Sequence, residues 1–187
     1  MLVAHCICAD IPRLSLRTRL ALVMHQREWT KTTNTGHLAL RSLERSQLFL
    51  WGEEGQAAPI PDEVVPPGGV GVVLAPSGLP LTPERVAELT AGPPLTLVAT
   101  DGSWRQATKM LRRIPALAAL TRVSLPVGAP SAYQLRAEPH PEGLATFEAI
   151  ARALGLLEGD AVRVALERPF HLMVARTLLT RGQAPSP

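Results

Sequence analysis

Residues 97–107 read Leu97-Val98-Ala99-Thr100-Asp101-Gly102-Ser103-Trp104-Arg105-Gln106-Ala107. A short apolar run ends at an Asp-Gly pair, and the polar residues that follow predict a helix from Ser103. Open α/β sheets bind ligands at such junctions, at the carboxyl ends of their strands. An acid, a flexible glycine and a tryptophan within four residues combine a proton acceptor, close backbone approach and a flat apolar surface. The stretch therefore predicts a ligand site at Asp101.

The pattern of the whole chain places this junction in an α/β fold. Short apolar runs predict strands at 19–25, 47–51, 71–75, 94–100 and 122–125. Helical patterns follow at 37–45, from Thr82, at 103–114, 146–156 and 160–180, where Pro169 must kink or split the last helix. Residues 52–69 predict a long loop, and the third strand is expected to end at Pro76. Because strands alternate with helices, we expect a mostly parallel sheet flanked by helices.

Composition limits the class of protein. The chain has 187 residues, 46% hydrophobic and 19% charged, which suits one globular domain over residues 1–180 and a disordered tail over 181–187. No apolar run approaches the roughly 20 residues that cross a membrane. The first residues lack a basic segment followed by an apolar stretch, and the two cysteines do not form a disulfide framework. We therefore expect a cytoplasmic protein without a membrane partner.

Charge is distributed unevenly along the chain. Residues 13–45 contain seven basic and two acidic residues, and residues 105–122 contain five basic residues and no acidic one. An acidic segment, 52–100, separates them. If the two basic segments converge in the fold, they form a surface for a polyanion such as RNA. The alternative is an ordinary solvated surface.

Each candidate site residue also has an ordinary structural interpretation. An Asp before a helix often caps it, but Ser103 can cap this helix equally well, which leaves Asp101 for chemistry. Trp104 is either a core aromatic or part of the site. The polar stretch 25–36 precedes a helix, so it either holds a carboxylate or phosphate or is a loop capped by Asn34 and Thr35.

Other common sites find little support. Cys6-x-Cys8 supplies two ligands, whereas a structural zinc site needs four, so we expect no metal there. The sequence contains no phosphate-binding loop, no dinucleotide fingerprint, no His-Glu-x-x-His and no Gly-x-Ser-x-Gly.

The ordered set of short motifs resembles the DTW-domain family. The Asp101 to Trp104 block is similar to the family's Asp-x-Thr-Trp or Asp-x-Ser-Trp pattern. The other matching pieces occur in the family's order and are Cys6-Ile7-Cys8, His25-x-x-Glu28, Asn34-Thr35-Gly36, Leu74-Ala75-Pro76-Ser77 and Leu144-Ala145-Thr146-Phe147-Glu148-Ala149. The chain is also similar to the ribosomal RNA aminocarboxypropyltransferases. The family's bacterial members have further cysteines upstream of Cys6, which this sequence does not contain.

The resemblance implies a tRNA-uridine aminocarboxypropyltransferase that uses S-adenosylmethionine, with a SPOUT-like fold and a C-terminal knot. It implies a catalytic site at Asp101 and Trp104. The cofactor would be held by Thr35, Gly36, Leu74, Ala75, Pro76, Ser77, Gly102, Ser103, Leu125, Thr146 and Ala149. The tRNA would be held by Arg27, Lys31, Arg105, Lys109, Arg112 and Arg113.

The implied reaction joins N3 of a uridine to the methionine side arm and releases methylthioadenosine. Asp101 would either take the N3 proton or orient the uridine through its N3–H. We expect a monomer. Two alternatives stay open at this point, namely an RNA methyltransferase of the same fold and an RNA-binding protein without catalysis.

Overall fold

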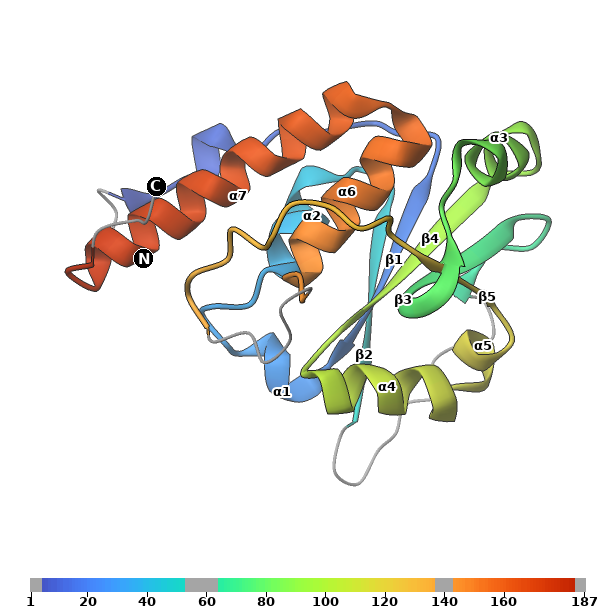
Figure 1. The fold of residues 1–187 in the computed structure, drawn as a ribbon. Coiled ribbons are helices and arrows are strands. Elements are labelled where there is room, and N and C mark those ends of the chain that lie inside the picture. Colours follow the sequence, from blue (N-terminus) through green and yellow to red (C-terminus); the bar gives the residue numbers. More distant parts are fainter. Residues whose placement is uncertain (1–4, 53–63, 137–142, 184–187) are drawn as a thin grey trace.

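Five parallel strands form the centre of the computed structural model, which describes residues 5–52, 64–136 and 143–183 (Figure 1). Their order across the sheet is β2-β1-β4-β3-β5. The strands are β1 (Arg19–His25), β2 (Ser46–Trp51), β3 (Val70–Pro80), β4 (Leu95–Asp101) and β5 (Thr121–Ser124). The predicted class, a parallel sheet flanked by helices, is confirmed.

Helices cover both faces of this sheet (Figure 1). Those on one face are α2 (Gly36–Ser42), α3 (Pro83–Ala91), α6 (Thr146–Glu158) and α7 (Asp160–Thr180), and those on the other are α4 (Trp104–Arg113) and α5 (Pro115–Ala118). A short helix, α1 (Gln26–Trp29), and a 3₁₀ turn, Cys8–Asp10, complete the described elements. Alternation within β1 shows why both faces are covered. Leu20 and Leu22 pack in the core under α2, α6 and α7, whereas Ala21 and Val23 pack in the core under α4 and α5.

The strands β1 and β4 are neighbours whose connections leave on opposite faces of the sheet. The chain passes from β1 toward α2 on one face, and from β4 into α4 on the other. In the register of this pair, Met24 lies opposite Asp101, so both strands end at the same level. Such a reversal opens a crevice at the carboxyl ends of the strands. The fold therefore places Asp101 at the edge where a parallel α/β sheet binds its ligand.

The structure corrects three sequence-based expectations. The predicted polar loop after residue 25 begins with α1, because the His25 Nδ1 accepts a hydrogen bond from the Arg27 N–H and caps that turn. The helix α7 runs through Pro169 as one element, with Pro169 buried, so of the kink or split that we expected the split is wrong.

Strand β3 is the third correction, because it continues past Pro76 to Pro80. Its pairing with β5 shifts register between Leu74 and Leu79, so a bulge lies between two paired segments. Gly78 lies in this bulge, where a Cβ atom would stand 2.4 Å from the backbone carbon of Val123. The strand continues only because residue 78 has no side chain.

The remaining predicted elements agree within a few residues, including the helix capped by Thr82 and opened by Pro83. No helix in the described ranges is long and apolar enough to cross a membrane. Most of the predicted 52–69 loop and the end of the predicted tail, 184–187, lie outside the described residues.

Candidate active site

The carboxylate of Asp101 joins three segments that are distant in the sequence. Its Oδ2 accepts a hydrogen bond of 2.5 Å from the Asn34 amide, just before α2. Its Oδ1 accepts one of 2.7 Å from the hydroxyl of Thr146, the first residue of α6. Asp101 is 5% exposed, so these two bonds hold a nearly buried acid in one orientation. A carboxylate has about four acceptor positions, and these two donors therefore leave acceptor capacity for a ligand.

Burial raises the pKa of Asp101 above its ordinary value, while the hydrogen bonds from Thr146 and Asn34 oppose that rise. Ser103, rather than Asp101, caps α4. Its hydroxyl accepts from the Gln106 N–H at 3.4 Å, and the Gln106 Oε1 accepts from the Ser103 N–H at 2.7 Å. The capping box leaves Asp101 for another purpose, as the sequence predicted.

A glycine lets α2 approach this carboxylate. A Cβ atom on Gly36 would stand 2.6 Å from the Asp101 Oδ2 and 2.9 Å from the Leu22 Cδ2. Asn34 uses its Oδ1 to accept from the His37 N–H at 3.2 Å while its amide bonds Asp101. Asn34 therefore caps the start of α2 and also holds the Asp101 carboxylate, whereas a role of this stretch in binding a ligand stays a prediction.

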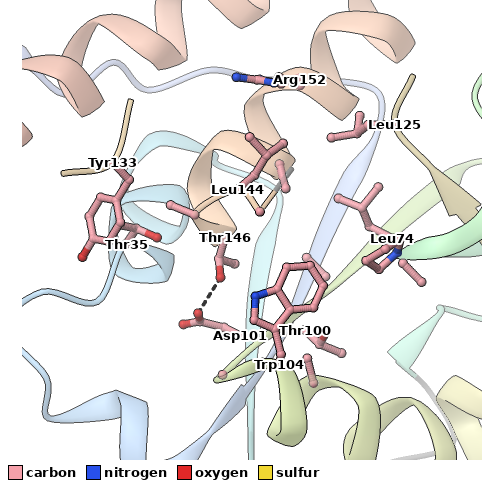
Figure 2. A pocket seen from close by; sticks show the side chains of 18 of the residues that line it. Thr35, Leu74, Thr100, Asp101, Trp104, Leu125, Tyr133, Leu144, Thr146 and Arg152 are labelled. Atoms are coloured by element: carbon pink, nitrogen blue, oxygen red, sulfur yellow. Dashed lines mark hydrogen bonds between the residues drawn. The ribbon is translucent and has the colours of Figure 1, made fainter. Parts of the chain in front are cut away.

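A cavity of about 1000 Å³ lies over Asp101. Figure 2 shows Asp101, Thr146 and Trp104 among its lining residues, brought together from β4, α6 and α4. One part of the wall is apolar and comes from Leu74, Ala75, Pro76, Leu125 and the Pro126–Pro130 loop. The opposite part is polar and contains Glu28, Lys31, Thr33, Asn34, Thr35 and Arg136. A ligand with a flat apolar end and a charged end would match this division.

A second buried carboxylate belongs to the polar part. Glu28 is 1% exposed and pairs with Lys31 at 2.5 Å and with Arg136 at 2.9 Å. Burial favours its neutral form, but the hydrogen bonds from Lys31 and Arg136 outweigh burial and hold the pKa of Glu28 below its ordinary value. Thr33 completes the group, because its hydroxyl accepts from the Arg136 Nε at 2.9 Å and its carbonyl accepts from the Tyr133 hydroxyl at 2.5 Å.

The start of α6 organises the loop that closes the cavity. The buried carboxylate of Glu148 accepts hydrogen bonds from the Ser131 hydroxyl at 2.5 Å, the Ala132 N–H at 2.7 Å and the Ala145 N–H at 2.9 Å. One turn later, Arg152 donates to the Ala129 carbonyl at 2.7 Å. The helix therefore positions the loop as well as Thr146.

Most of the predicted cofactor residues line this one cavity. They are Thr35, Leu74, Ala75, Pro76, Gly102, Ser103, Leu125, Thr146 and Ala149. Gly36 and Ser77 do not line it; Gly36 is buried against Asp101, and Ser77 is exposed in the bulge of β3. The catalytic pair, Asp101 and Trp104, lines it as well. The roles of these residues stay predictions.

The predicted RNA-binding residues divide into two groups. Lys31 and Arg105 line the cavity. The others lie exposed outside it, namely Arg27, Lys109, Arg112 and Arg113. The ammonium of Lys109 lies 5.6 Å from the centre of the Trp51 ring, a cation–π contact.

Cys6 and Cys8 are exposed free thiols. Among the described residues, no group of three or more His, Cys, Asp or Glu side chains is placed to hold a metal ion.

Sequence reasoning missed several lining residues of the loop that leads into α6 and of α6 itself, among them Tyr133, Arg136 and Arg152. The only signal was that each is a large polar or basic residue close to the matched segment at 144–149.

Comparison with protein families matches the DTW domain over residues 1–178. The chain belongs to the DTW-domain family. The family resemblance inferred from the motifs is thereby confirmed. A relative, tRNA-uridine aminocarboxypropyltransferase 2 of Drosophila melanogaster, is 37% identical over 92 residues, which are 49% of this chain and 36% of that protein. The match thus spans about a third of that relative's length.

A solved structure shares the fold. It is the SAM-dependent rRNA:acp-transferase Tsr3 from Vulcanisaeta distributa, with a TM-score of 0.51 and 21% identity over 92% of this chain and 85% of that one. At this identity the similarity concerns the fold alone. The C-terminal knot stays a prediction.

Proposed function

We propose that this chain transfers the 3-amino-3-carboxypropyl group of S-adenosylmethionine to N3 of a uridine in tRNA, releasing methylthioadenosine. The observation that carries the proposal is the oriented, nearly buried carboxylate of Asp101 on the wall of a divided cavity. Membership of the DTW-domain family and the relative named for this activity support it.

The cavity fits the cofactor. Adenine and its ribose would lie against the apolar wall formed by Leu74, Ala75, Pro76 and Leu125, and the methionine end would face the polar wall at Thr35. When bound, S-adenosylmethionine supplies a sulfonium that makes each of its three attached carbons open to attack. Because the residues decide which carbon faces the substrate, orientation is their main catalytic task.

Asp101 is the residue that meets the uridine in this proposal. Uridine N3 carries a proton that must leave as the new N–C bond forms. Burial makes the Asp101 carboxylate a stronger base than a free one, and the bonds from Asn34 and Thr146 keep it directed. The open acceptor capacity of the carboxylate takes the N3–H hydrogen bond and then the proton.

The uridine must leave its stack to reach this depth. The indole of Trp104, the first residue of α4, lines the same cavity as Asp101 and would offer the flipped base an apolar surface. Nearby cations would hold the RNA backbone without reading its sequence.

The test is to incubate the protein with S-adenosylmethionine and unmodified tRNA transcripts and to identify the small product by mass spectrometry. We expect methylthioadenosine, formed only when RNA is present. S-adenosylhomocysteine would instead assign the chain to the methyltransferases, and a failure to bind the cofactor would overturn the proposal.

A matched pair of variants sharpens this test. Asp101→Asn keeps the size of the side chain and removes the base, so turnover should be lost while cofactor binding remains. Asp160→Asn, at an exposed position that pairs with Arg163, should leave turnover unchanged. Equal loss of binding and turnover in Asp101→Asn would contradict a role in proton transfer.

A further inference from the structure

A buried glutamate that holds two cations at the edge of the cavity has no part in the chemistry described so far. Both oxygens of Glu28 are engaged, Oε1 by Lys31 and Oε2 by Arg136. The glutamate is buried, yet the cations are not, since the side chains of Lys31 and Arg136 are 47% and 36% exposed. The arrangement therefore presents two charged heads to solvent from a fixed, buried anchor.

The cost of this arrangement indicates that it serves more than stability. Burying the Glu28 carboxylate carries a desolvation cost, so the cluster contributes little or nothing to stability compared with apolar packing. Thr33 adds a second anchor by accepting from the Arg136 Nε. Arg136 thus uses Nε to contact Thr33 and Nη1 to contact Glu28.

Of the two cations, Arg136 lies close enough to Asp101 to affect its pKa, although burial has the largest effect. The charge of Arg136 lowers the pKa of Asp101, after the larger effects of burial, Thr146, Asn34 and Glu28. A nucleotide whose base reaches Asp101 would extend its phosphate away from that carboxylate, and both Lys31 and Arg136 line the same cavity. An arginine and a lysine that are held on the same carboxylate suit a phosphate, as paired cations do at other phosphate sites.

We propose that Glu28 is a positioning residue that fixes Lys31 and Arg136 as a clamp for the backbone phosphate of the nucleotide whose base enters the cavity. The proposal rests on the proposed function. It assigns the charges of Lys31 and Arg136 to the RNA substrate, rather than to the carboxylate of the cofactor.

The test measures tRNA binding, cofactor binding and turnover separately. Arg136→Gln should weaken tRNA binding about tenfold. It should also make the slope of log affinity against log salt concentration shallower by about one, the amount expected for one lost phosphate contact. The affinity for S-adenosylmethionine should not change. Arg163→Gln is the matched control, because Arg163 also pairs with two carboxylates but does not line the cavity.

Glu28→Gln distinguishes positioning from simple charge. The substitution removes a negative charge, which by itself would strengthen the binding of RNA. Positioning predicts the opposite, a several-fold fall in kcat/KM for tRNA with unchanged cofactor affinity. If Glu28→Gln fails to fold, the exposed Arg136 variant still decides the question.

Three results would overturn the clamp. They are an unchanged salt slope in Arg136→Gln, stronger productive binding in Glu28→Gln, and a loss of cofactor affinity in either variant, which would assign the cations to the cofactor carboxylate. Wild-type turnover tests the proposed function, whereas the salt slopes come from binding alone, so the two failures can be told apart.

Discussion

Helix α6 is tied to the sheet at both of its ends by an acid and a threonine, but the two ties differ in their surroundings. At its start, Thr146 donates to Asp101 at the carboxyl end of β4. At its end, the Glu158 Oε1 accepts from the hydroxyl and the N–H of Thr18, just before β1, at 2.5 and 2.6 Å. The donor at the start of α6 is Thr146 on the helix itself, whereas the donor at its end is Thr18, next to the sheet.

The difference is what lies next to each acid. Asp101 lies on the wall of a cavity of about 1000 Å³, whereas Glu158 lines a hollow of about 240 Å³. Asp101 stands at the point where strand connections reverse, and Glu158 stands at the opposite end of the sheet. Hydrogen bonds alone therefore do not mark a site; position in the topology and open volume do.

The largest expected contrast concerns turnover. Asp101→Asn should lower methylthioadenosine formation by about 10³-fold, since a positioned base contributes on the order of 10² to 10⁴. Glu158→Gln should change it less than about twofold, because amino-end residues do not reach the cavity. Single-turnover rates with saturating cofactor check both. Similar losses of turnover in the two variants would show that each acid only attaches α6 to the sheet and that Asp101 has no separate part in the reaction.

The second contrast concerns two glycines. Gly36→Ala forces a Cβ atom against Asp101 and Leu22, and we expect a loss of about 1–3 kcal/mol in the free energy of unfolding. Gly92→Ala, at the amino end, meets nothing closer than 3.8 Å at a φ of −88° and should be neutral or stabilising by up to about 1 kcal/mol. Urea denaturation measures both, and an unchanged Gly36→Ala protein would contradict the close approach of α2.

The third contrast concerns stability and pH. The pKa of Asp101 is raised in the folded state, so its contribution to stability is complete below the unfolded pKa and is lost as pH rises through the folded pKa. At neutral pH the buried charge is a cost that Asn avoids. Asp101→Asn should therefore raise the free energy of unfolding by about 1 kcal/mol at pH 7, and this gain should shrink near pH 4.

Glu158→Gln supplies the comparison for that measurement. It weakens two hydrogen bonds without relieving a deeply buried charge, so it should lower stability by about 1 kcal/mol. A stabilised Glu158→Gln protein, or a destabilised Asp101→Asn protein at neutral pH, would contradict the expectation that only the acid at the carboxyl end of the sheet costs stability when charged.

The smallest expected effect is a shift in a pH profile. Thr146→Val keeps the shape of the side chain but removes a hydrogen bond that lowers the pKa of Asp101. The pKa of the acid should rise, so the acid limb of the turnover profile should move to higher pH. Thr18→Val removes the corresponding donor at the amino end and should leave the profile in place. Rates measured across pH with both variants decide this.

The sequence predicted the elements better than their connections to the site. Apolar runs located β1 and β4, and the Asp-Gly pair located the junction, because these signals are local. The continuation of β3 through its bulge depends on the contact of Gly78 with the Val123 backbone, which no local pattern contains.

The candidate site shows the same division. Asp101, Trp104 and Thr146 were found through motifs, whereas Arg136 reaches Glu28 across 108 residues. Such a pair becomes visible only when the sheet brings residues 28 and 136 to the same edge. Gly36 was assigned to the cofactor through the family resemblance, but it lies against Asp101 instead of lining the cavity.

The long reach of the Asp101 bonds has a consequence for folding. Its partners lie 67 and 45 residues away in the sequence. Contacts of such separation form late in folding, because each requires a large loop to close at a cost in chain entropy. The ligand cavity is therefore absent from any partly folded chain that has not yet docked α6. A ligand that needs the Asp101 carboxylate held by both Asn34 and Thr146 binds only the folded protein. Its binding therefore shifts the unfolding equilibrium toward the folded state. Bound cofactor would therefore lower the fraction of molecules that are open to proteolysis.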